Sequence, residues 1–267
     1  MVDSDLIHRL GETRKYHIDS LVRLGGFAFS DSFFLYTSGE IGPYFVNSDV
    51  VSTEGGDYRK AVDDMGGLVC EKMRGKDYQV VSGGESRDWI FSLPIANVLW
   101  KSIAMLYKDG RFVGADVNGK KVIHVADINN EGSSLEKWVK MIREKGGIIE
   151  DVFFYVDRME GGVNIAEELG LNRHALVELD EDAWTYLKQS NVVLEGIYSQ
   201  IMFRKKTLRK WGEEMLKSEQ GIARLVELWN KDEREQSKLR KLLENYSSLQ
   251  SYLIEALKRE GIEVDLQ

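Results

Sequence analysis

The chain has 267 residues, of which 43% are hydrophobic and only two are proline, a composition typical of a globular protein with a sizeable core. Its net charge of −8 argues against general binding to nucleic acid, because there is no basic excess to neutralise a phosphate backbone. No apolar run approaches the roughly 18 residues of a membrane span, and the N-terminus lacks the pattern of a signal peptide. With Cys70 as its one cysteine, the chain has no internal disulfide and no cysteine-based zinc site. We therefore expect a cytoplasmic protein with no membrane partner, in which Cys70 is a buried filler residue.

The first part of the chain predicts a helix followed by extended segments. Residues 3–25 carry apolar residues at helical spacing and end at two glycines. The aromatic-rich segment 27–36 is typical of a strand. In the next segment, 37–47, the glycines and Pro43 mark a turn between two short extended pieces. A second helix is expected over about 58–72, where one helical face is apolar.

The middle of the chain alternates between short apolar strands and helices. We expect strands at 78–81, 103–107, 122–125 and 148–156, and a helix from Trp89 to Trp100 after the first of them. Strands that alternate with helices predict an α/β fold with an open, mainly parallel sheet flanked by helices. Ligands of such sheets bind beyond the carboxyl ends of the strands, where this chain carries glycine-rich and charged turns.

The turn after the third of these strands carries the clearest chemical signal. Asp127 ends the strand, Gly132 lies in the turn, and helical spacing resumes at Leu135. A strand that leads through small residues into a helix offers free backbone N–H groups and the positive end of the helix dipole to a phosphate. The Asp127 carboxylate could hold ribose hydroxyls or a metal ion beside that phosphate. The alternative is an ordinary turn that binds nothing, in which Ser133 and Glu136 form a capping box.

The C-terminal part changes in character from about Leu208 onward. Its apolar residues step by three and four, which predicts helices with a narrow apolar seam. The seam belongs either to a helical hairpin that packs on its own domain or to an arm that binds a second copy or another partner. We therefore divide the chain into an α/β domain, 1–190, and a helical C-terminal extension, 191–267. The seam residues are Leu239, Leu242, Tyr246, Leu249, Leu253 and Ala256.

Four stretches of the chain occur in an order that is known from one enzyme family. They are 37–47, 83–88, 122–134 and the pair Asp157-Arg158. Together they resemble motifs of the type I phosphoribosyltransferases and are most similar to those of the orotate branch. In that order the motifs cover the orotate, bind pyrophosphate, bind 5-phosphoribosyl-1-diphosphate (PRPP), and place an arginine at the orotate carboxylate. The resemblance covers roughly residues 20–190 and implies the same α/β fold.

The resemblance implies transfer of a phosphoribosyl group from PRPP to orotate, which gives orotidine 5-phosphate and pyrophosphate in pyrimidine nucleotide synthesis. The transition state has oxocarbenium character, so catalysis would depend on positioning and on charge stabilisation of the leaving group. Mg²⁺ would arrive bound to PRPP, and no residue is expected to ligate a metal directly. His8, His17 and His174 show no metal-ligand spacing. The resemblance further implies a homodimer.

The resemblance also implies roles for individual residues. An arginine such as Arg158 suits the carboxylate of a flat ring because its guanidinium is planar. The residues expected to act in catalysis are Asp127, Lys108 and Arg87. Those expected to contact orotate are Phe45, Val46 and Arg158. Those expected to bind pyrophosphate are Gly83, Gly84, Glu85, Ser86, Arg87, Lys108 and Arg111. Those expected to bind PRPP through its phosphate and ribose are Asp127, Asn129, Asn130, Glu131, Gly132, Ser133 and Ser134.

Several positions depart from the family pattern. Ala126 stands where the PRPP motif has a first acidic residue, Glu131 stands in the phosphate loop, and Thr37 replaces a lysine. The loop 109–119, which is mobile and rich in Lys and His in the family, is short here and offers only Arg111. These departures favour a second hypothesis, a non-catalytic PRPP-binding, nucleotide-binding or regulatory protein on the same fold.

Two further polar residues have structural interpretations. His124 lies within the predicted strand 122–125 and is expected to be a core histidine. Asp88 stands where the family prefers glycine. It either disturbs the pyrophosphate turn or caps the helix that begins at Trp89.

Overall fold

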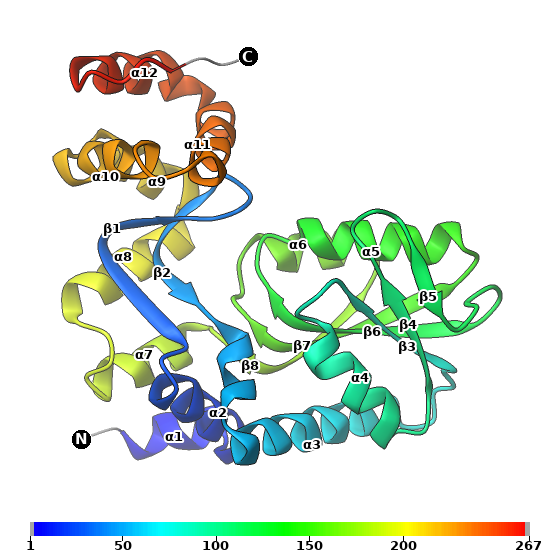
Figure 1. The fold of residues 1–267 in the computed structure, drawn as a ribbon. Coiled ribbons are helices and arrows are strands. Elements are labelled where there is room, and N and C mark those ends of the chain that lie inside the picture. Colours follow the sequence, from blue (N-terminus) through cyan, green and yellow to red (C-terminus); the bar gives the residue numbers. More distant parts are fainter. Residues whose placement is uncertain (1–2, 265–267) are drawn as a thin grey trace. The chain divides into compact units, whose positions relative to one another are not determined.

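The computed structural model describes residues 3–264, which form two compact units (Figure 1). The first unit contains the residues up to Gly26 together with Asn47–Gln189. The second contains Phe27–Val46 together with the residues from Ser190 onward. This division differs from the expected ranges 1–190 and 191–267, because the segment 27–46 belongs to the same unit as the C-terminal helices. No helix within the described residues is long and apolar enough to cross a membrane.

A six-stranded sheet in the order β5-β4-β3-β6-β7-β8 forms the centre of the first unit. All neighbouring strands run parallel except β5, which pairs antiparallel with β4 at one edge. The expected open, mainly parallel sheet is therefore confirmed. The strands are β3 (Val80–Gly84), β4 (Ser102–Leu106), β5 (Phe112–Gly114), β6 (Lys121–Asn129), β7 (Ile148–Asp157) and β8 (Asn172–Glu178).

The two edge strands were not expected from the sequence. β5 lies inside the segment that was expected to be a loop, 108–121, and β8 follows the last expected strand. Both are only partly buried, so neither shows the continuous apolar run of a strand that is covered on both faces. The central strands β3, β6 and β7 are buried along most of their length, and their apolar runs made them recognisable.

Helices cover both faces of this sheet (Figure 1). α5 (Ser133–Glu144) and α6 (Gly161–Glu168) lie on one face, and α3 (Gly55–Lys72) and α4 (Trp89–Val98) lie on the other. The apolar stripe of α5, formed by Leu135, Trp138, Val139 and Ile142, is buried in one cluster with residues of the sheet, including Val122 of β6. The remaining helices of this unit are α1 (Ser4–Leu10), α2 (Glu12–Arg23), the 3-10 helix η1 (Ser48–Thr53) and α7 (Glu181–Gln189).

Two local expectations for this unit are wrong. The helix expected over 3–25 consists of α1 and α2, because Gly11 lies between them with a positive φ of 76° that a helix cannot continue. Cys70 is exposed rather than buried. α3 buries the stripe that contains Met65 and Val69, and Cys70 lies one residue beyond that stripe.

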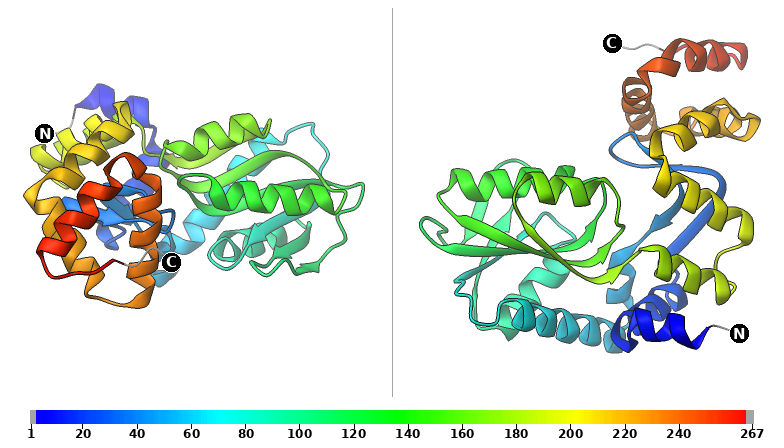
Figure 2. Two further views of the ribbon diagram at one scale, coloured as in Figure 1. Left: turned by 90° about the horizontal axis from the view of Figure 1, so that it is seen from above. Right: turned by 180° about the vertical axis from the view of Figure 1, so that it is seen from behind.

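The second unit is a two-stranded hairpin that packs on helices (Figure 2). β1 (Phe27–Leu35) pairs antiparallel with β2 (Ile41–Val46), as the turn signals of the sequence indicated. Phe33, Ile41 and Trp211 are buried in one apolar cluster that joins the hairpin to the helices. These helices are α8 (Glu195–Lys206), α9 (Leu208–Lys217), α10 (Glu219–Trp229), α11 (Glu233–Asn245), the 3-10 helix η2 (Ser247–Leu249) and α12 (Gln250–Arg259).

The apolar seam of the C-terminal helices is part of this same cluster. Leu239, Leu242, Tyr246, Leu249 and Leu253 are all buried in the core of the second unit. The seam therefore packs within its own unit, which is the first of the two interpretations suggested by its spacing.

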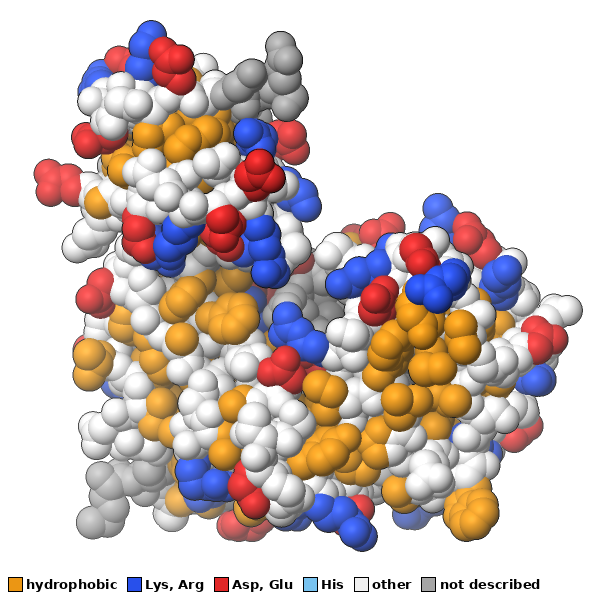
Figure 3. Space-filling model, viewed as in Figure 1, with side chains coloured by type: hydrophobic (Ala, Val, Ile, Leu, Met, Phe, Trp, Pro, Cys, Tyr) orange, Lys and Arg blue, Asp and Glu red, His pale blue; other side chains and the backbone are white. Residues whose placement is uncertain are grey.

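Charged side chains of both signs are interspersed over each unit on the face shown in Figure 3. Charged side chains also pair along helices, as Lys60 does with Asp64 in α3 and Arg209 with Glu213 in α9. Among the described residues on that face, no extended basic patch is visible of the kind that contacts a nucleic-acid backbone.

Candidate functional site

Three turns follow three neighbouring parallel strands of the first unit. They span 85–88 after β3, 130–132 after β6 and 158–160 after β7. Backbone hydrogen bonds join the second turn to the third. The N–H of Arg158 donates to the carbonyl of Asn129 at 3.0 Å, and the N–H of Gly162 donates to the carbonyl of Asn130 at 2.8 Å. Because parallel strands end at the same edge of a sheet, these turns form one continuous surface at its carboxyl end.

The turn after β6 leads into the N-terminus of α5. Gly132 is the N-cap residue with a φ of 82°, and no side-chain hydrogen bond caps the helix. The alternative of a capping box is therefore wrong, because Ser133 is already helical and cannot act as the cap. Ser133 and Ser134 are exposed and form the first turn of α5. Their backbone N–H groups and hydroxyls, together with the helix dipole, present a suitable site for a phosphate.

Glu131 lies beside the start of α6. A Cβ atom added at Gly161 would lie 2.6 Å from Glu131 Oε2, so the glycine makes room for the carboxylate. A Cβ atom at Gly162 would overlap Asn129 and the carbonyl of Asn130. The two glycines thus allow α6 to approach the phosphate turn closely. The Glu131 carboxylate lies near a second helix N-terminus, which partly offsets the cost of a negative charge in this turn.

Asp127 is buried in β6, with 5% of its surface exposed. Its Oδ2 atom accepts a hydrogen bond of 2.8 Å from the hydroxyl of Ser48. Burial, followed by the negative charge of Asp88, raises the pKa of Asp127 to about 8, although Ser48 and Arg87 act in the opposite direction. The carboxyl group therefore holds a proton at neutral pH in the ligand-free protein.

The turn after β3 is tied to its surroundings by both backbone and side chains. A Cβ atom at Gly84 would overlap the indole nitrogen of Trp138, so this glycine lets α5 pack directly on the turn. Glu85 Oε2 accepts a hydrogen bond of 2.8 Å from the backbone N–H of Lys108. The carboxylate of Glu85 thus joins the turn after β3 to the turn after β4. Ser86 is exposed in the same turn, and the peptide bond that precedes it is cis.

The two arginines expected to bind pyrophosphate differ in how they are held. Arg87 is about half exposed, and its Nε atom lies 3.8 Å from Asp49 Oδ2. Arg111 donates from Nε to Asp109 Oδ2 at 2.7 Å, and its guanidinium lies 4.2 Å from the centre of the Tyr107 ring. Arg87 forms only a long ion pair that a ligand at this edge could replace. Arg111 is held by Asp109 and Tyr107, so a ligand would have to compete with these contacts.

Lys137 is a basic residue near the same turns that the sequence reasoning missed. Its Nζ atom donates a hydrogen bond of 2.6 Å to the carbonyl of Lys108, and both lysines are exposed. The signal that could have identified it is its position in the second turn of α5, shortly after Ser133. A side chain there can reach back over the start of its own helix.

Arg158 is buried, with 2% of its surface exposed, rather than open to solvent. Its Nη2 atom lies 3.1 Å from Glu160 Oε2, and its Nη1 atom donates to Asn130 Oδ1 at 3.4 Å. A carboxylate ligand would therefore compete with Glu160 for the guanidinium. The preceding Asp157 is fully buried and accepts a hydrogen bond of 2.7 Å from Arg173, a partner that the sequence reasoning did not identify.

Phe45 and Val46 belong to the second unit, where they end β2. Phe45 is exposed and Val46 is buried. Their expected contact with the same ligand as Arg158 stays a prediction.

The oxygen donors at the turns suit magnesium carried by a ligand. Among residues 3–264, no group of three or more His, Cys, Asp and Glu side chains is placed to hold a metal ion. The Glu85 carboxylate and the serine hydroxyls are hard oxygen groups, of the kind that accompany a Mg²⁺ ion bound mainly by phosphate oxygens and water. The residues present thus fit Mg²⁺ as part of a diphosphate ligand.

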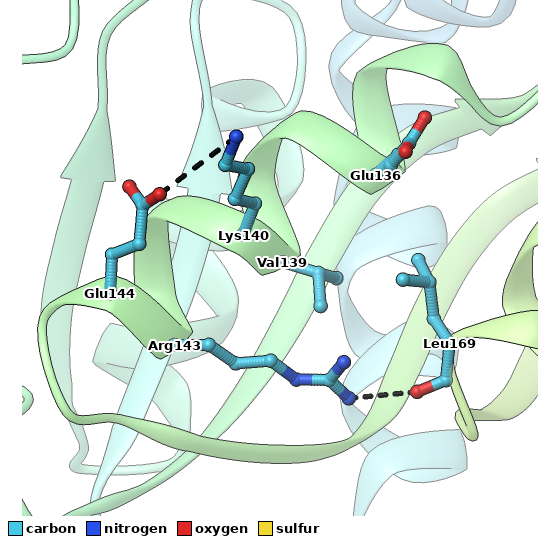
Figure 4. Close-up of a pocket in the computed structure, with 6 residues that line it drawn as sticks. All are labelled: Glu136, Val139, Lys140, Arg143, Glu144 and Leu169. Carbon is cyan, nitrogen blue, oxygen red and sulfur yellow. Dashed lines mark hydrogen bonds and ion pairs between the residues drawn. The ribbon is translucent and has the colours of Figure 1, made fainter.

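A surface groove of about 480 Å³ lies on the first unit beside α5 (Figure 4). Arg143 borders it and donates a hydrogen bond of 2.8 Å to the carbonyl of Leu169. Lys140 and Glu144 form an ion pair of 3.9 Å on the same helix. None of the residues expected to bind PRPP or orotate lines this groove. The lining residues are Glu136, Val139, Lys140, Arg143, Glu144 and Leu169.

Known proteins resemble this chain in sequence and in fold, although no protein-family model matches it. It is 30% identical over 149 residues to the orotate phosphoribosyltransferase of Staphylothermus marinus, a match that covers 54% of this chain and 71% of that protein. It is 32% identical over 180 residues to the orotate phosphoribosyltransferase of Sulfolobus acidocaldarius, covering 61% and 83% of the two chains. Among solved structures, orotate phosphoribosyltransferase from Francisella tularensis shares the fold with a TM-score of 0.58 and 20% identity, covering 72% of this chain and 98% of that one.

Proposed function

The chain belongs to the orotate phosphoribosyltransferase family, and from this membership we propose that it transfers the phosphoribosyl group of PRPP to orotate. In the reaction the bond between C1 of the ribose and the pyrophosphate oxygen breaks, and a bond forms between C1 and a ring nitrogen of orotate. The products are orotidine 5-phosphate and pyrophosphate, as in pyrimidine nucleotide synthesis. The observation that carries the proposal is the joining of three of the four motif stretches, those that follow β3, β6 and β7, into one surface around Asp127.

The 5-phosphate of PRPP would bind at the start of α5. The backbone N–H groups of residues 130–134 and the hydroxyls of Ser133 and Ser134 supply the donors. Asp127 lies at the end of the preceding strand, where its carboxyl group would bind the ribose hydroxyls. Ser48 holds that carboxyl group in one orientation before the substrate arrives.

The pyrophosphate would bind over the turn after β3. The backbone of 83–87 together with Arg87 and Lys108 would hold it, and Lys137 lies close enough to Lys108 to add a further positive charge. A Mg²⁺ ion carried by PRPP would supply charge neutralisation of the leaving group. Catalysis would consist mainly in holding C1 in position and stabilising the charge that develops on the pyrophosphate.

Orotate would present its carboxylate to Arg158. Arg158 already pairs with Glu160 in a buried position. The orotate carboxylate would therefore either displace Glu160 from the guanidinium or share the guanidinium with it. A planar guanidinium can make two parallel hydrogen bonds to a carboxylate, which a lysine cannot.

The second hypothesis, a non-catalytic binding protein, is not favoured. Two relatives that match more than half of this chain, at 30% and 32% identity, are orotate phosphoribosyltransferases. The unusual residues of the phosphate turn are also accommodated, since Glu131 lies beside α6. We further propose that the protein is a cytoplasmic homodimer, and sedimentation of the purified full chain would test its oligomeric state.

The test of the proposed function is turnover by the purified full chain with PRPP, Mg²⁺ and orotate, measured as formation of orotidine 5-phosphate. Uracil and adenine serve as alternative bases, and the variant Asp127→Ala serves as the inactive control. The proposal requires product with orotate and much less with the other bases. Absence of product, together with intact calorimetric binding of PRPP, would instead support the non-catalytic hypothesis.

A further inference from the structure

Asp88 connects two of the turns that would bind PRPP. It precedes α4, but its side chain makes no capping hydrogen bond to that helix. Instead its Oδ2 atom accepts a hydrogen bond of 2.8 Å from the N–H of Gly84, and its Oδ1 atom accepts one of 3.3 Å from the N–H of Asp127. The interpretation that the side chain caps α4 is therefore wrong, whereas an effect of Asp88 on pyrophosphate binding stays a prediction.

The position of these two N–H groups explains why a carboxylate is needed there. The paired positions of β3 and β6 end at Ser82 and His124. Beyond that point the two strands no longer pair with each other, and Gly84 and Asp127 are buried residues. A buried N–H group without an acceptor is unfavourable, because it has lost its hydrogen bond to water. Asp88 therefore supplies the hydrogen-bond acceptors that the pairing of β3 with β6 no longer provides. Its two hydrogen bonds fix the distance between the ends of these strands.

His124 lies behind this carboxylate. It is buried, and its Nδ1 atom lies 3.0 Å from the hydroxyl oxygen of Ser82. That hydroxyl donates its proton to the carbonyl of Ile123 at 3.1 Å, so Nδ1 is the donor to Ser82. The Nε2 atom lies 3.5 Å from Asp88 Oδ2 and has no hydrogen-bond partner among the described residues. A second proton on this ring would therefore point at Asp88.

We propose that Asp88 and His124 are positioning residues for PRPP: the carboxylate, backed by the imidazole, holds the pyrophosphate turn and Asp127 in the relative geometry that binding requires. In this arrangement neither side chain would contact the substrate. Asp88 acts through Gly84 and Asp127, and His124 acts through Asp88. The inference rests on the proposed function for the identity of the ligand. The connection between the two turns is a property of the ligand-free protein.

The charge of Asp88 also acts on the reacting end of the site. Burial is the largest cause of the raised pKa of Asp127, and the negative charge of Asp88 is the second. Ser48 and Arg87 lower this pKa. Removal of the charge is therefore expected to lower the pKa of Asp127. A residue with only a packing role would not produce this shift.

Asp88→Asn is the test variant because asparagine keeps the size of the side chain but retains only one acceptor oxygen. Asp151→Asn is a matched control. Asp151 is a buried carboxylate on the same sheet that contacts His174 Nε2 at 3.0 Å and Lys76 Nζ at 3.0 Å, and it lies in none of the three turns. Both variants replace one buried carboxylate of the first unit by an amide.

The first measurement is the steady-state kinetics of both variants with PRPP, Mg²⁺ and orotate as a function of pH. We expect Asp88→Asn to lower kcat/KM for PRPP by about tenfold or more and to move the pH dependence that reports Asp127 to lower pH. Asp151→Asn is expected to stay within about twofold of the unmodified protein. Equal effects of the two variants would overturn the proposal.

The second measurement needs no turnover and keeps the two proposals separable. In the ligand-free protein, hydrogen exchange at the amides of Gly84 and Asp127 is expected to be about tenfold faster at one or both sites in Asp88→Asn, with no such change in Asp151→Asn. Unchanged exchange would overturn the positioning role even if the enzyme is active. Faster exchange in a protein without turnover would support the role of Asp88 while the proposed function fails.

His124→Gln tests the second member of the pair. Glutamine can still reach Ser82 but lacks the imidazole ring that faces Asp88. We expect a severalfold lower kcat/KM for PRPP with an unchanged circular-dichroism spectrum. If kcat/KM and its pH dependence both match those of the unmodified protein, His124 has no positioning role.

Discussion

The hydroxyl of Ser48 donates a hydrogen bond of 2.8 Å to Oδ2 of Asp127, and both side chains are buried. Ser48 is the first residue of η1, and it lies 79 positions before Asp127 in the sequence. The carboxyl group expected to bind ribose is thus oriented by a distant segment of the first unit. Its surroundings determine both its orientation and its protonation, which leads to the first prediction.

Asp127→Asn is expected to stabilise the ligand-free protein at high pH. The pKa of Asp127 is raised from 3.8 to about 8, so between these pH values the folded protein holds a proton that the unfolded chain has released. The free energy of unfolding therefore falls as pH rises through this window, and asparagine lacks this dependence. A gain of 1 kcal/mol corresponds to about 2–4 °C in Tm for a chain of this size.

Thermal unfolding at pH 8.5 and pH 4.5 measures this difference. We expect a gain of several degrees for Asp127→Asn at pH 8.5 and little change at pH 4.5, together with loss of transferase activity. An equal gain at both pH values would show that the Asp127 carboxyl group does not titrate as described. Asp151→Asn serves as a control of opposite sign. Burial raises the pKa of Asp151, but hydrogen bonds from His174 and Lys76 outweigh burial and lower it, so this variant loses stability at neutral pH.

Gly132→Ala is expected to impair PRPP binding and stability together. Gly132 has a φ of 82°, and an added Cβ atom would lie 2.7 Å from Ile165 Cβ, so the phosphate turn would have to move. We expect a KM for PRPP at least tenfold higher and a stability loss of about 2–3 kcal/mol from strain and overpacking. Gly170→Ala is the matched control, because its φ is also positive, at 67°, but nothing lies within 4 Å of the added atom. A raised KM in that control would contradict the explanation.

Glu131→Gln is expected to tighten PRPP binding. A carboxylate near the 5-phosphate repels it by roughly 1–2 kcal/mol at an effective dielectric constant near 20, so the amide is expected to lower KM for PRPP by about tenfold. The exposed Glu136 in the first turn of α5 provides the control variant Glu136→Gln. If both variants change KM equally, the effect is one of general charge rather than of the phosphate turn.

Arg158→Lys is expected to weaken orotate binding selectively. Lysine keeps the positive charge but loses the planar fork that a carboxylate matches, so we expect KM for orotate to rise by about tenfold or more. KM for PRPP is expected to change less, because the hydrogen bond from the Arg158 guanidinium to Asn130 Oδ1 in the phosphate turn is long, at 3.4 Å. Arg143→Lys, in the groove beside α5, is the control. An unchanged KM for orotate would exclude Arg158 as the carboxylate contact.

Leu242→Ala is expected to destabilise the second unit. Leu242 is fully buried in the cluster that joins the hairpin β1–β2 to the helices, and deletion of such a side chain costs about 2–5 kcal/mol. Tyr252, which is 46% exposed, provides the control variant Tyr252→Ala. Chemical unfolding followed by circular dichroism would measure both. A cost below 1 kcal/mol for Leu242→Ala would contradict its place in this core.

Much of the sheet and the location of the candidate site could be predicted from the sequence. The apolar runs of β3, β6 and β7 identified buried strands, and their parallel order placed the turns that follow them at one edge. The helical spacing that resumes at Leu135 identified α5 and hence a helix N-terminus for a phosphate. These features depend on the local periodicity of apolar residues and on general rules of chain connection.

The tertiary structure alone decided how the polar groups of the site are used. The capping box at Ser133 was a reasonable local pattern, but Gly132 takes the cap position because it can adopt a positive φ beside α6. Likewise, no local signal shows that Asp88 bridges Gly84 and Asp127 or that Arg158 pairs with Glu160 in a buried position. Hydrophobic periodicity repeats along the chain and is visible in it. A hydrogen bond between two buried polar groups depends on the distance between separate elements, which is set only when those elements pack.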